Sequence, residues 1–170
     1  SKLNGFCALA PAGRDERRET KGGGDDRLER GPAYSSPIAN PKSQIQNPPD
    51  WPTYRHDPAR SGSTETAVPT TRLQRLWQAE VGVRHEVGGK LSSVVVAEGK
   101  LFVADVEAHA VHALDANTGS PVWSFTAGGR VDSPPTSWRG RVLFGSADGW
   151  VYCLRAADGQ LAWRFRAAPE

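Results

Sequence analysis

The sequence predicts an all-β fold assembled from repeated units of four short antiparallel strands, and three observations predict it. The first is an internal repeat of about forty residues, in which Val111–Phe125 aligns with Val151–Phe165 without a gap and six of the fifteen aligned positions are identical. The second is alternation, since Trp123 and Phe125 share one face of an extended strand while Ser124 takes the other. The third is that no helical period of useful length competes with this pattern.

Each unit contains four segments with the apolar and β-branched composition of strands, separated by turn signals. Glu98-Gly99 marks one turn, and Asp148-Gly149 is a strong signal for a tight hairpin. The expected strands are Leu91–Val96, Leu101–Ala104, His109–Leu114 and Pro121–Thr126 in the first unit, and Thr136–Trp138, Arg141–Gly145, Trp150–Leu154 and Leu161–Arg166 in the second.

Sheets of this kind carry apolar side chains on both faces, so they must stack on one another to bury them. Repeated four-stranded units that stack around an axis form a β-propeller, which needs about four to eight blades to close. A partial copy precedes the two complete ones, because Leu76-Trp77 corresponds to Val122-Trp123 and Ala162-Trp163. We therefore expect a partial β-propeller with two complete blades and one strand of another, from a parent ring of about seven or eight blades.

The chain divides into three parts by composition. Residues 1–50 hold only two of the 14 aromatic residues and combine a mixed-charge run with a proline-rich stretch. Such a segment buries too little apolar surface to offset the entropy of ordering it, so we expect it to be disordered or a linker. Residues 51–72 are expected to form an irregular lead-in, and residues 73–170 hold the repeats, with blades over 91–126 and 133–166.

Composition also excludes several classes of function. The formal net charge is +2 and neither half of the chain has an excess of Lys and Arg, which argues against nucleic-acid binding. No run approaches the ~18 apolar residues that a membrane span needs. Cys7 and Cys153 form no CxxC pair and no disulfide framework. The chain begins at Ser1 and contains no Met, so we expect a piece of a longer polypeptide whose remaining blades complete the ring.

Polar residues near the expected strand ends are candidates for chemistry, but each has a plainer structural interpretation. His109 and His112 are three residues apart, which puts them on opposite faces of a strand, where they cannot chelate one metal. Acidic hairpin tips are usually solvated, and this applies to Asp105, Glu107 and Asp148.

The other candidates lack the partners that their chemistry requires. Ser92-Ser93 and Ser133 lie near the inner strands without a His–Asp pair to activate them. Gly128-Gly129, like Gly22–Gly24, lacks the lysine and the following helix of a phosphate loop. Arg130 and Asp132 join the two blades, where a ligand contact is the less favoured interpretation. We therefore predict no catalytic, cofactor-binding or metal-binding residue in this chain.

The segment from Ala113 to Trp123 has the form AxDxxTGxxxW and resembles the tryptophan-docking motif of quinoprotein-type (PQQ-like) propeller repeats. The second copy, from Cys153 to Trp163, keeps the glycine and the tryptophan but has Cys153 in place of the alanine and Arg155 in place of the aspartate. The lead-in WPTYRHDPARSG also resembles the start of such propellers in bacterial proteins. The predicted structural motif comprises Ala113, Asp115, Thr118, Gly119, Trp123, Gly159 and Trp163.

The resemblance implies that each motif tryptophan packs against the corresponding turn of the next blade. It further implies a non-catalytic scaffold similar to the BamB-type platforms of outer-membrane protein assembly, which bind protein partners outside the cytoplasm. The partners expected for this chain are the remaining blades of its own ring and other proteins. A periplasmic or otherwise extracytoplasmic location is expected on the same basis.

Two alternatives remain at this point. The resemblance also covers PQQ-dependent alcohol and sugar dehydrogenases, in which PQQ and Ca²⁺ lie on the axis beside a disulfide of adjacent cysteines. This chain has no adjacent cysteine pair, so PQQ and Ca²⁺ would be bound only in the full-length parent. Propellers with Trp-Asp repeats are disfavoured because Trp123 is followed by Ser and Trp163 by Arg.

Overall fold

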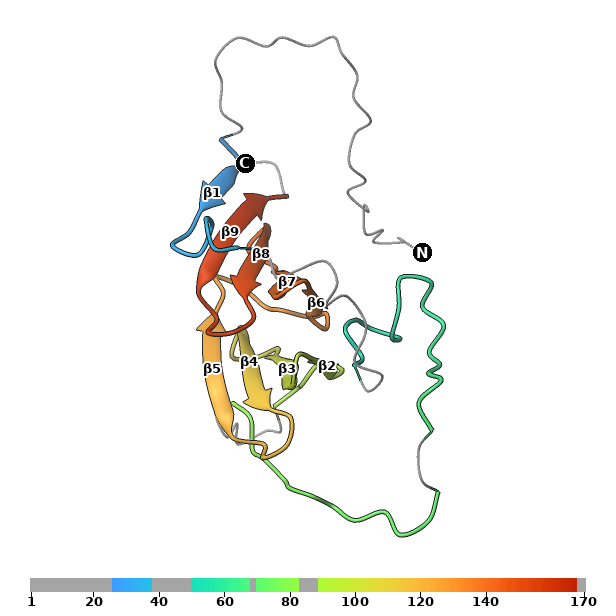
Figure 1. Ribbon diagram of the computed structural model, residues 1–170. Helices are drawn as coiled ribbons and strands as arrows, with labels where there is room; N and C mark the ends of the chain where they lie inside the picture. The colour runs from blue at the N-terminus through green and yellow to red at the C-terminus, as the bar shows by residue number, and fades with distance from the viewer. Residues whose placement is uncertain (1–25, 38–49, 68–69, 83–88, 168–170) are drawn as a thin grey trace, which may run out of the picture.

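The computed structural model describes residues 26–37, 50–67, 70–82 and 89–167, and over these ranges it contains strands and no helix. Two antiparallel sheets account for the fold (Figure 1). The first has the order β2-β3-β4-β5 and the second has the order β1-β9-β8-β7-β6. The all-β partial propeller predicted from the sequence is thus confirmed. The strands are β1 (Leu28–Arg30), β2 (Val95–Ala97), β3 (Lys100–Asp105), β4 (Ala110–Asp115), β5 (Pro121–Thr126), β6 (Thr136–Trp138), β7 (Arg141–Gly145), β8 (Trp150–Arg155) and β9 (Leu161–Arg166).

The first hairpin of each blade turns through two residues in the left-handed conformation. Glu98 and Gly99 have φ values of 54° and 69°, and Arg139 and Gly140 have values of 49° and 72°. Two consecutive positive φ angles are the mark of the type I′ turn, whose twist matches that of the flanking strands. The backbone amide of Gly140 also donates a 2.8 Å hydrogen bond to the Glu98 carboxylate, so the two equivalent turns are joined side by side.

The inner strand of the first blade is shorter than predicted. The expected strand over 91–96 is interrupted, because Leu91 bridges to Asp105 and regular pairing resumes only at Val95. The Ser92 hydroxyl accepts a 3.0 Å hydrogen bond from the backbone amide of Ala104. A serine that bonds to the backbone in this way competes with the ladder of the sheet, which explains the irregularity.

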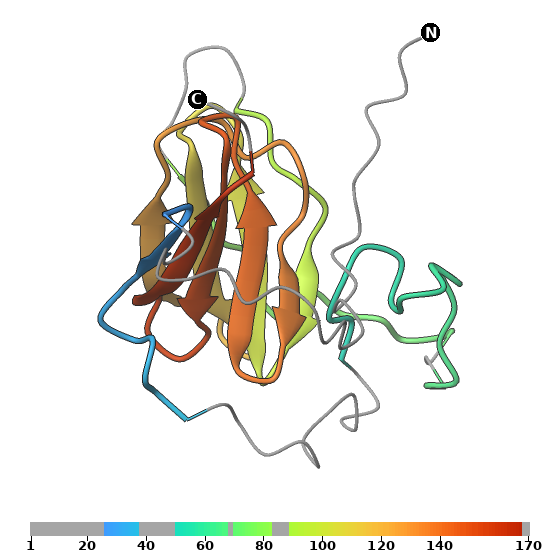
Figure 2. The same ribbon diagram turned by 90° about the horizontal axis from the view of Figure 1, so that it is seen from above.

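The two blades lie face to face and bury one continuous core between them (Figure 2). Phe102 and Val111 of the first blade are fully buried there, as are Val142 and Leu154 of the second. An aromatic cluster fills the wider part, where the Phe144 and Tyr152 rings stack with centroids 5.3 Å apart and Phe125 meets Tyr152 edge-on at 5.6 Å. Stacking of the blades is therefore what removes their apolar faces from water.

The lead-in segment runs along the inner edges of both blades. Trp51 exchanges two backbone hydrogen bonds with Val96, of 2.6 and 2.9 Å. The next residue, Pro52, accepts a 2.7 Å bond from the amide of Ser137 at the inner edge of the second blade. The segment therefore ties both inner strands together, although it forms only an isolated bridge and no strand of its own.

The outer edge of the second blade carries a strand that the sequence did not predict. Within residues 1–50, expected to be disordered or a linker, β1 pairs antiparallel with β9, beside which it lies in Figure 1. Glu29 accepts a 2.7 Å hydrogen bond from the Arg164 guanidinium, and Ala33 is fully buried. The stabilisation comes from backbone pairing with an open sheet edge, which needs little apolar surface. Residues 1–25 and 38–49 lie outside the described part, so the prediction is not tested there.

Residues 73–82 contribute no strand, although Leu76-Trp77 corresponds to the outer strand of a blade. Among the described residues no neighbouring strand pairs with this segment, and a strand is defined by its pairing. Leu76 is largely exposed, whereas Trp77 is half-buried against the first blade.

Asp148, which lies in the connection between β7 and β8, should contribute to the loss of folding stability at acid pH. Burial alone would raise the pKa of Asp148, but hydrogen bonds from the Tyr152 hydroxyl and the Trp150 amide outweigh it and hold the pKa below its ordinary value. A lowered pKa in the folded state means stability that is present above pH ~4 and is lost as the pH falls through the folded pKa.

We expect Asp148→Asn to cost about 1 kcal/mol at pH 7 after allowance for solvent screening, and to flatten the decline of stability as the pH falls below about 4. The measurement is the free energy of unfolding in urea across this range. Asp132→Asn, which removes an exposed carboxylate, serves as the control. An unchanged pH profile in Asp148→Asn would contradict this role.

Candidate functional site

The contact between the two blades is made by an indole that lies on a turn of its neighbour. The Trp123 Nε1–H donates a 2.9 Å hydrogen bond to the backbone carbonyl of Ala156. The six-membered part of the indole lies so close to Gly159 that a Cβ atom there would come within 2.7 Å of the ring. Gly159 is also left-handed, with φ of 72°, so both the backbone conformation and the close approach require glycine.

The preceding tryptophan repeats this contact one blade earlier. Trp77 Nε1–H donates a 3.1 Å bond to the carbonyl of Ala116, and its ring lies 2.5 Å from where a Cβ of Gly119 would stand. Gly119 has the same φ of 72°. The same geometry therefore occurs twice, with Trp77 on the turn at Gly119 and Trp123 on the turn at Gly159.

In the first blade an aspartate builds the turn that receives the indole. Asp115 Oδ1 accepts hydrogen bonds from the amides of Asn117 and Thr118 and from the Thr118 hydroxyl, at 3.0, 2.9 and 3.0 Å. These bonds hold the pKa of the exposed Asp115 carboxyl below its usual value. Ala113 is buried opposite Trp123 in the neighbouring strand, where a larger side chain would compete with the indole.

The equivalent turn of the second blade has the same backbone shape but different side chains. Arg155 stands where the aspartate is expected, and Asp158 stands where the threonine is expected. The two form an ion pair, and the amide of Gln160 donates to the same Asp158 carboxylate. The backbone bond that closes the turn is unchanged, since Gly119 N donates to Asp115 O and Gly159 N donates to Arg155 O, both at 2.8 Å.

The third motif tryptophan has a different environment. Among the described residues Trp163 Nε1 has no hydrogen-bond partner, whereas the other two indoles each donate to a carbonyl. Trp163 packs instead against the cluster of Ala33, Cys153 and Ala162. Burial raises the pKa of the Cys153 thiol to about 11, so this cysteine is a packing residue rather than a nucleophile.

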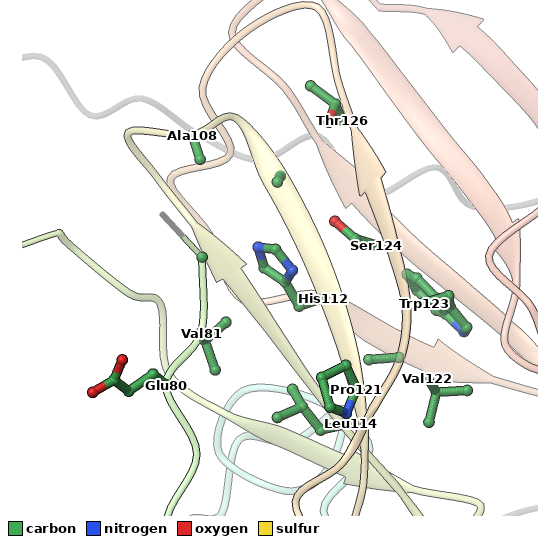
Figure 3. A pocket seen from close by; sticks show the side chains of 13 residues that line it. Glu80, Val81, Ala108, His112, Leu114, Pro121, Val122, Trp123, Ser124 and Thr126 are labelled. Atoms are coloured by element: carbon green, nitrogen blue, oxygen red, sulfur yellow. The ribbon is translucent and has the colours of Figure 1, made fainter. Parts of the chain in front are cut away.

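A hollow of about 530 Å³ lies on the outer face of the first blade, between residues 80–82 and the strands β4 and β5. Figure 3 shows the His112 imidazole facing the segment that carries Glu80 and Val81. His112 Nε2 is buried without a hydrogen bond among the described residues, and burial lowers the pKa of this histidine while the nearby Asp105 raises it in part. The walls are mostly apolar, with His112, Ser124 and Thr126 among the polar residues.

A smaller hollow of about 110 Å³ lies where the lead-in meets the inner strands. Its walls include Asp50, His56 and Trp138. Burial raises the pKa of Asp50, against the effect of a hydrogen bond from the Glu98 backbone. His56 Nδ1 lies 3.7 Å from the Asp57 carboxylate, and its ring packs against Trp51 at 4.8 Å between centroids.

In the described part of the chain, the remaining candidate residues form no common site. Asp105 was expected to be solvated at a hairpin tip, and this expectation is wrong, because it is 1% exposed and accepts a 3.1 Å bond from the Ala108 amide. Arg130 and Asp132 form an exposed pair at 3.4 Å. His109 occupies a left-handed turn position before β4 rather than the strand.

The PQQ-dependent alternative calls for metal ligands and an adjacent cysteine pair. No group of three or more His, Cys, Asp or Glu side chains in the described part of the chain is arranged to hold a metal ion. Cys153 has no adjacent cysteine in the sequence, and Cys7 lies outside the described residues.

Docking tryptophans between four-stranded blades define a β-propeller repeat protein. The family model described as "Outer membrane protein assembly factor BamB" matches residues 67–170, which is more than half of the chain. The chain belongs to this family of PQQ-like propeller repeats, and the resemblance seen in the motif is confirmed.

Known proteins of two kinds are similar to this chain. The assembly factor BamB of Xanthomonas campestris is 30% identical over 112 residues, which are 60% of this chain and 27% of that protein. The quinohemoprotein alcohol dehydrogenase of Comamonas testosteroni is 28% identical over 137 residues, which are 68% of this chain and 18% of that enzyme. The crystal structure of the Comamonas enzyme matches 70% of this chain and 19% of its own, with a TM-score of 0.54 and 25% identity.

The chain spans 27% or less of the length of these curated relatives. No helix in the described residues is long and apolar enough to cross a membrane.

Removing the docking indole should be far more costly than removing a surface indole. We expect Trp123→Ala to destabilise the protein by about 3 kcal/mol, since a large cavity and an unpaired Ala156 carbonyl remain. Trp138, which is 48% exposed, provides the control as Trp138→Ala. Thermal melts measure both variants, and equal shifts in Tm would argue against the docking role.

Alanine substitutions at two glycines can distinguish the cost of crowding the indole from the cost of backbone strain. Gly159 and Gly99 both have positive φ, at 72° and 69°, but a Cβ at Gly99 would meet nothing within 4 Å. We expect Gly99→Ala to cost about 1 kcal/mol from strain alone, and Gly159→Ala to cost a further 1–3 kcal/mol as the indole is pushed away. Urea unfolding gives both values; similar costs would show that the ring does not pack on Gly159.

Proposed function

We propose that this chain forms two consecutive blades of a non-catalytic β-propeller that serves as a binding platform for other proteins outside the cytoplasm of a bacterium. The observation that carries the proposal is the docking of Trp77 and Trp123, each on the turn of the following blade. Docking of this kind makes a rigid stack, and a rigid stack leaves its loops free to vary and to bind.

A surface with the composition of a protein interface lies beside the lead-in. We call it the lead-in surface, and it consists of Tyr54, Arg55, Arg60, Trp138 and Arg139. The two aromatic residues are 41% and 48% exposed. Arg139 lies 4.4 Å from the centroid of the Trp138 ring, and Arg55 and Arg60 lie 5.6 and 5.8 Å from that of Tyr54.

Tyr, Trp and Arg are the residues that most often dominate the energy of protein interfaces. Each aromatic ring of the lead-in surface lies against an arginine side chain, a contact that would reduce the side-chain entropy lost on binding. The backbone beneath them is tied to both blades through Val96 and Ser137. The name of the BamB relatives, as outer membrane protein assembly factors, points to the assembly machinery of the outer membrane as the partner.

The lead-in surface should therefore contribute to partner binding without contributing to stability. We expect Tyr54→Ala and Trp138→Ala each to weaken binding to that assembly machinery about tenfold while Tm stays within about 2 °C. Val122, which is 44% exposed on the outer strand β5, provides the control as Val122→Ala. Binding is measured with the purified partner complex, and a loss equal in all three variants would contradict the assignment.

The second candidate is a part of a PQQ-dependent alcohol or sugar dehydrogenase. It is supported by the similarity to the Comamonas quinohemoprotein alcohol dehydrogenase, which extends over 68% of this chain. The two functions are separated by adding PQQ and Ca²⁺ to the purified full-length protein and following dye reduction with alcohols and sugars. Substrate-dependent dye reduction would favour the enzyme, and its absence together with partner binding would favour the platform.

A further inference from the structure

Two arginines lie directly opposite each other in the second blade. Arg141, the first residue of β7, is the register partner of Arg155, the last residue of β8. Like charges in this arrangement destabilise a sheet. The equivalent pair in the first blade is Lys100 and Asp115, which have opposite charges. The exchange of aspartate for Arg155 has therefore replaced a pair of opposite charges by two like charges, of which only Arg155 has a carboxylate partner, Asp158, among the described residues.

One of these arginines is almost completely buried. Arg141 is 7% exposed, and its Nη2–H donates a 2.7 Å hydrogen bond to the backbone carbonyl of Ser36. Its Nη1 is also buried, and no residue in the described part of the chain accepts a hydrogen bond from it. A buried guanidinium that lacks a carboxylate partner costs several kcal/mol.

The second arginine points to the same place. Arg155 uses Nε and Nη2 for the Asp158 carboxylate, and its Nη1–H donates a 2.7 Å bond to the Ser36 hydroxyl. Two guanidinium groups thus converge on one neutral residue. Glu29 does not relieve them, because its carboxylate pairs with Arg164.

We propose that Arg141 and Arg155 form an oxyanion-binding site beside the docking turn of the second blade, which takes a carboxylate or phosphate group at the position now filled by the Ser36 hydroxyl. The guanidinium fork is the group best suited to bind the two oxygens of such an anion. An anion here would accept the unused Nη1–H donor of Arg141 and cancel the repulsion between the two arginines. Ser36 holds the site in this structure through its carbonyl and its hydroxyl.

The anion has two sources that an experiment separates. A carboxylate can be placed on the chain itself by Ser36→Asp, and Ser35→Asp adds the same charge at the exposed neighbouring position. A free anion can be supplied as inorganic phosphate at constant ionic strength. Thermal melts of the whole 170-residue chain at low ionic strength report both.

We expect Ser36→Asp to raise Tm by about 3–6 °C and Ser35→Asp to change it by less than about 1 °C. Arg141→Gln in the Ser36→Asp background should abolish the gain. If Arg141→Gln does not fold, Arg155→Gln takes its place, since it removes the more accessible guanidinium.

In phosphate buffer the Tm of the wild-type protein should be about 1–3 °C higher than in chloride buffer of equal ionic strength. The arginine variant should show no such difference between the two buffers. A gain with Ser36→Asp alone assigns the site to an anion carried on a chain. A gain with phosphate alone assigns it to a free anion that displaces Ser36. If neither treatment shifts Tm in an arginine-dependent way, the proposal is wrong.

Discussion

The indole that lies on a glycine of the next blade is the contact on which the rest of the structure depends. A four-stranded blade has two apolar faces, and it is stable only when both are covered. The Trp123 hydrogen bond to the Ala156 carbonyl fixes the distance and the rotation between two blades at their outer end, while Trp51 and Pro52 tie them at the inner end. Between these two ends the side chains of Phe102, Phe144 and Leu154 pack in one continuous core.

The second blade shows that the shape of the docking turn matters more than the residue that builds it. In the first blade the Asp115 carboxylate receives the amides of the turn, and in the second the Asp158 carboxylate does so while held by Arg155. In both arrangements a backbone carbonyl accepts the indole N–H, and a left-handed glycine lies at the equivalent position. The exchange keeps the scaffold and changes the local charge, and this is how a repeat protein acquires a site that its other repeats lack.

Two segments outside the blades pack against sheet surface that would otherwise be exposed. The outer edge of β9 pairs with β1, and Ala33 fills the space beside Trp163 and Cys153. On the opposite side of the stack, residues 80–82 lie over part of the outer face of the first blade, and the hollow around His112 lies between them and the strands (Figure 3). Surface covered in this way contributes to stability, because apolar side chains are removed from water.

The amino-acid sequence alone determined the repeat, the positions of most strands and the motif with Trp123 and Gly119, because alternation and the chemistry of turns are local properties. The tertiary structure alone decided three other matters. It placed Arg141 opposite Arg155 and brought Ser36 to both, a contact across more than a hundred residues that no local pattern encodes. It paired β1 with β9, because a polar segment forms a strand wherever an open edge supplies the hydrogen bonds. It buried Asp105, because the solvation of a carboxylate depends on what packs over it and not on its place in a hairpin.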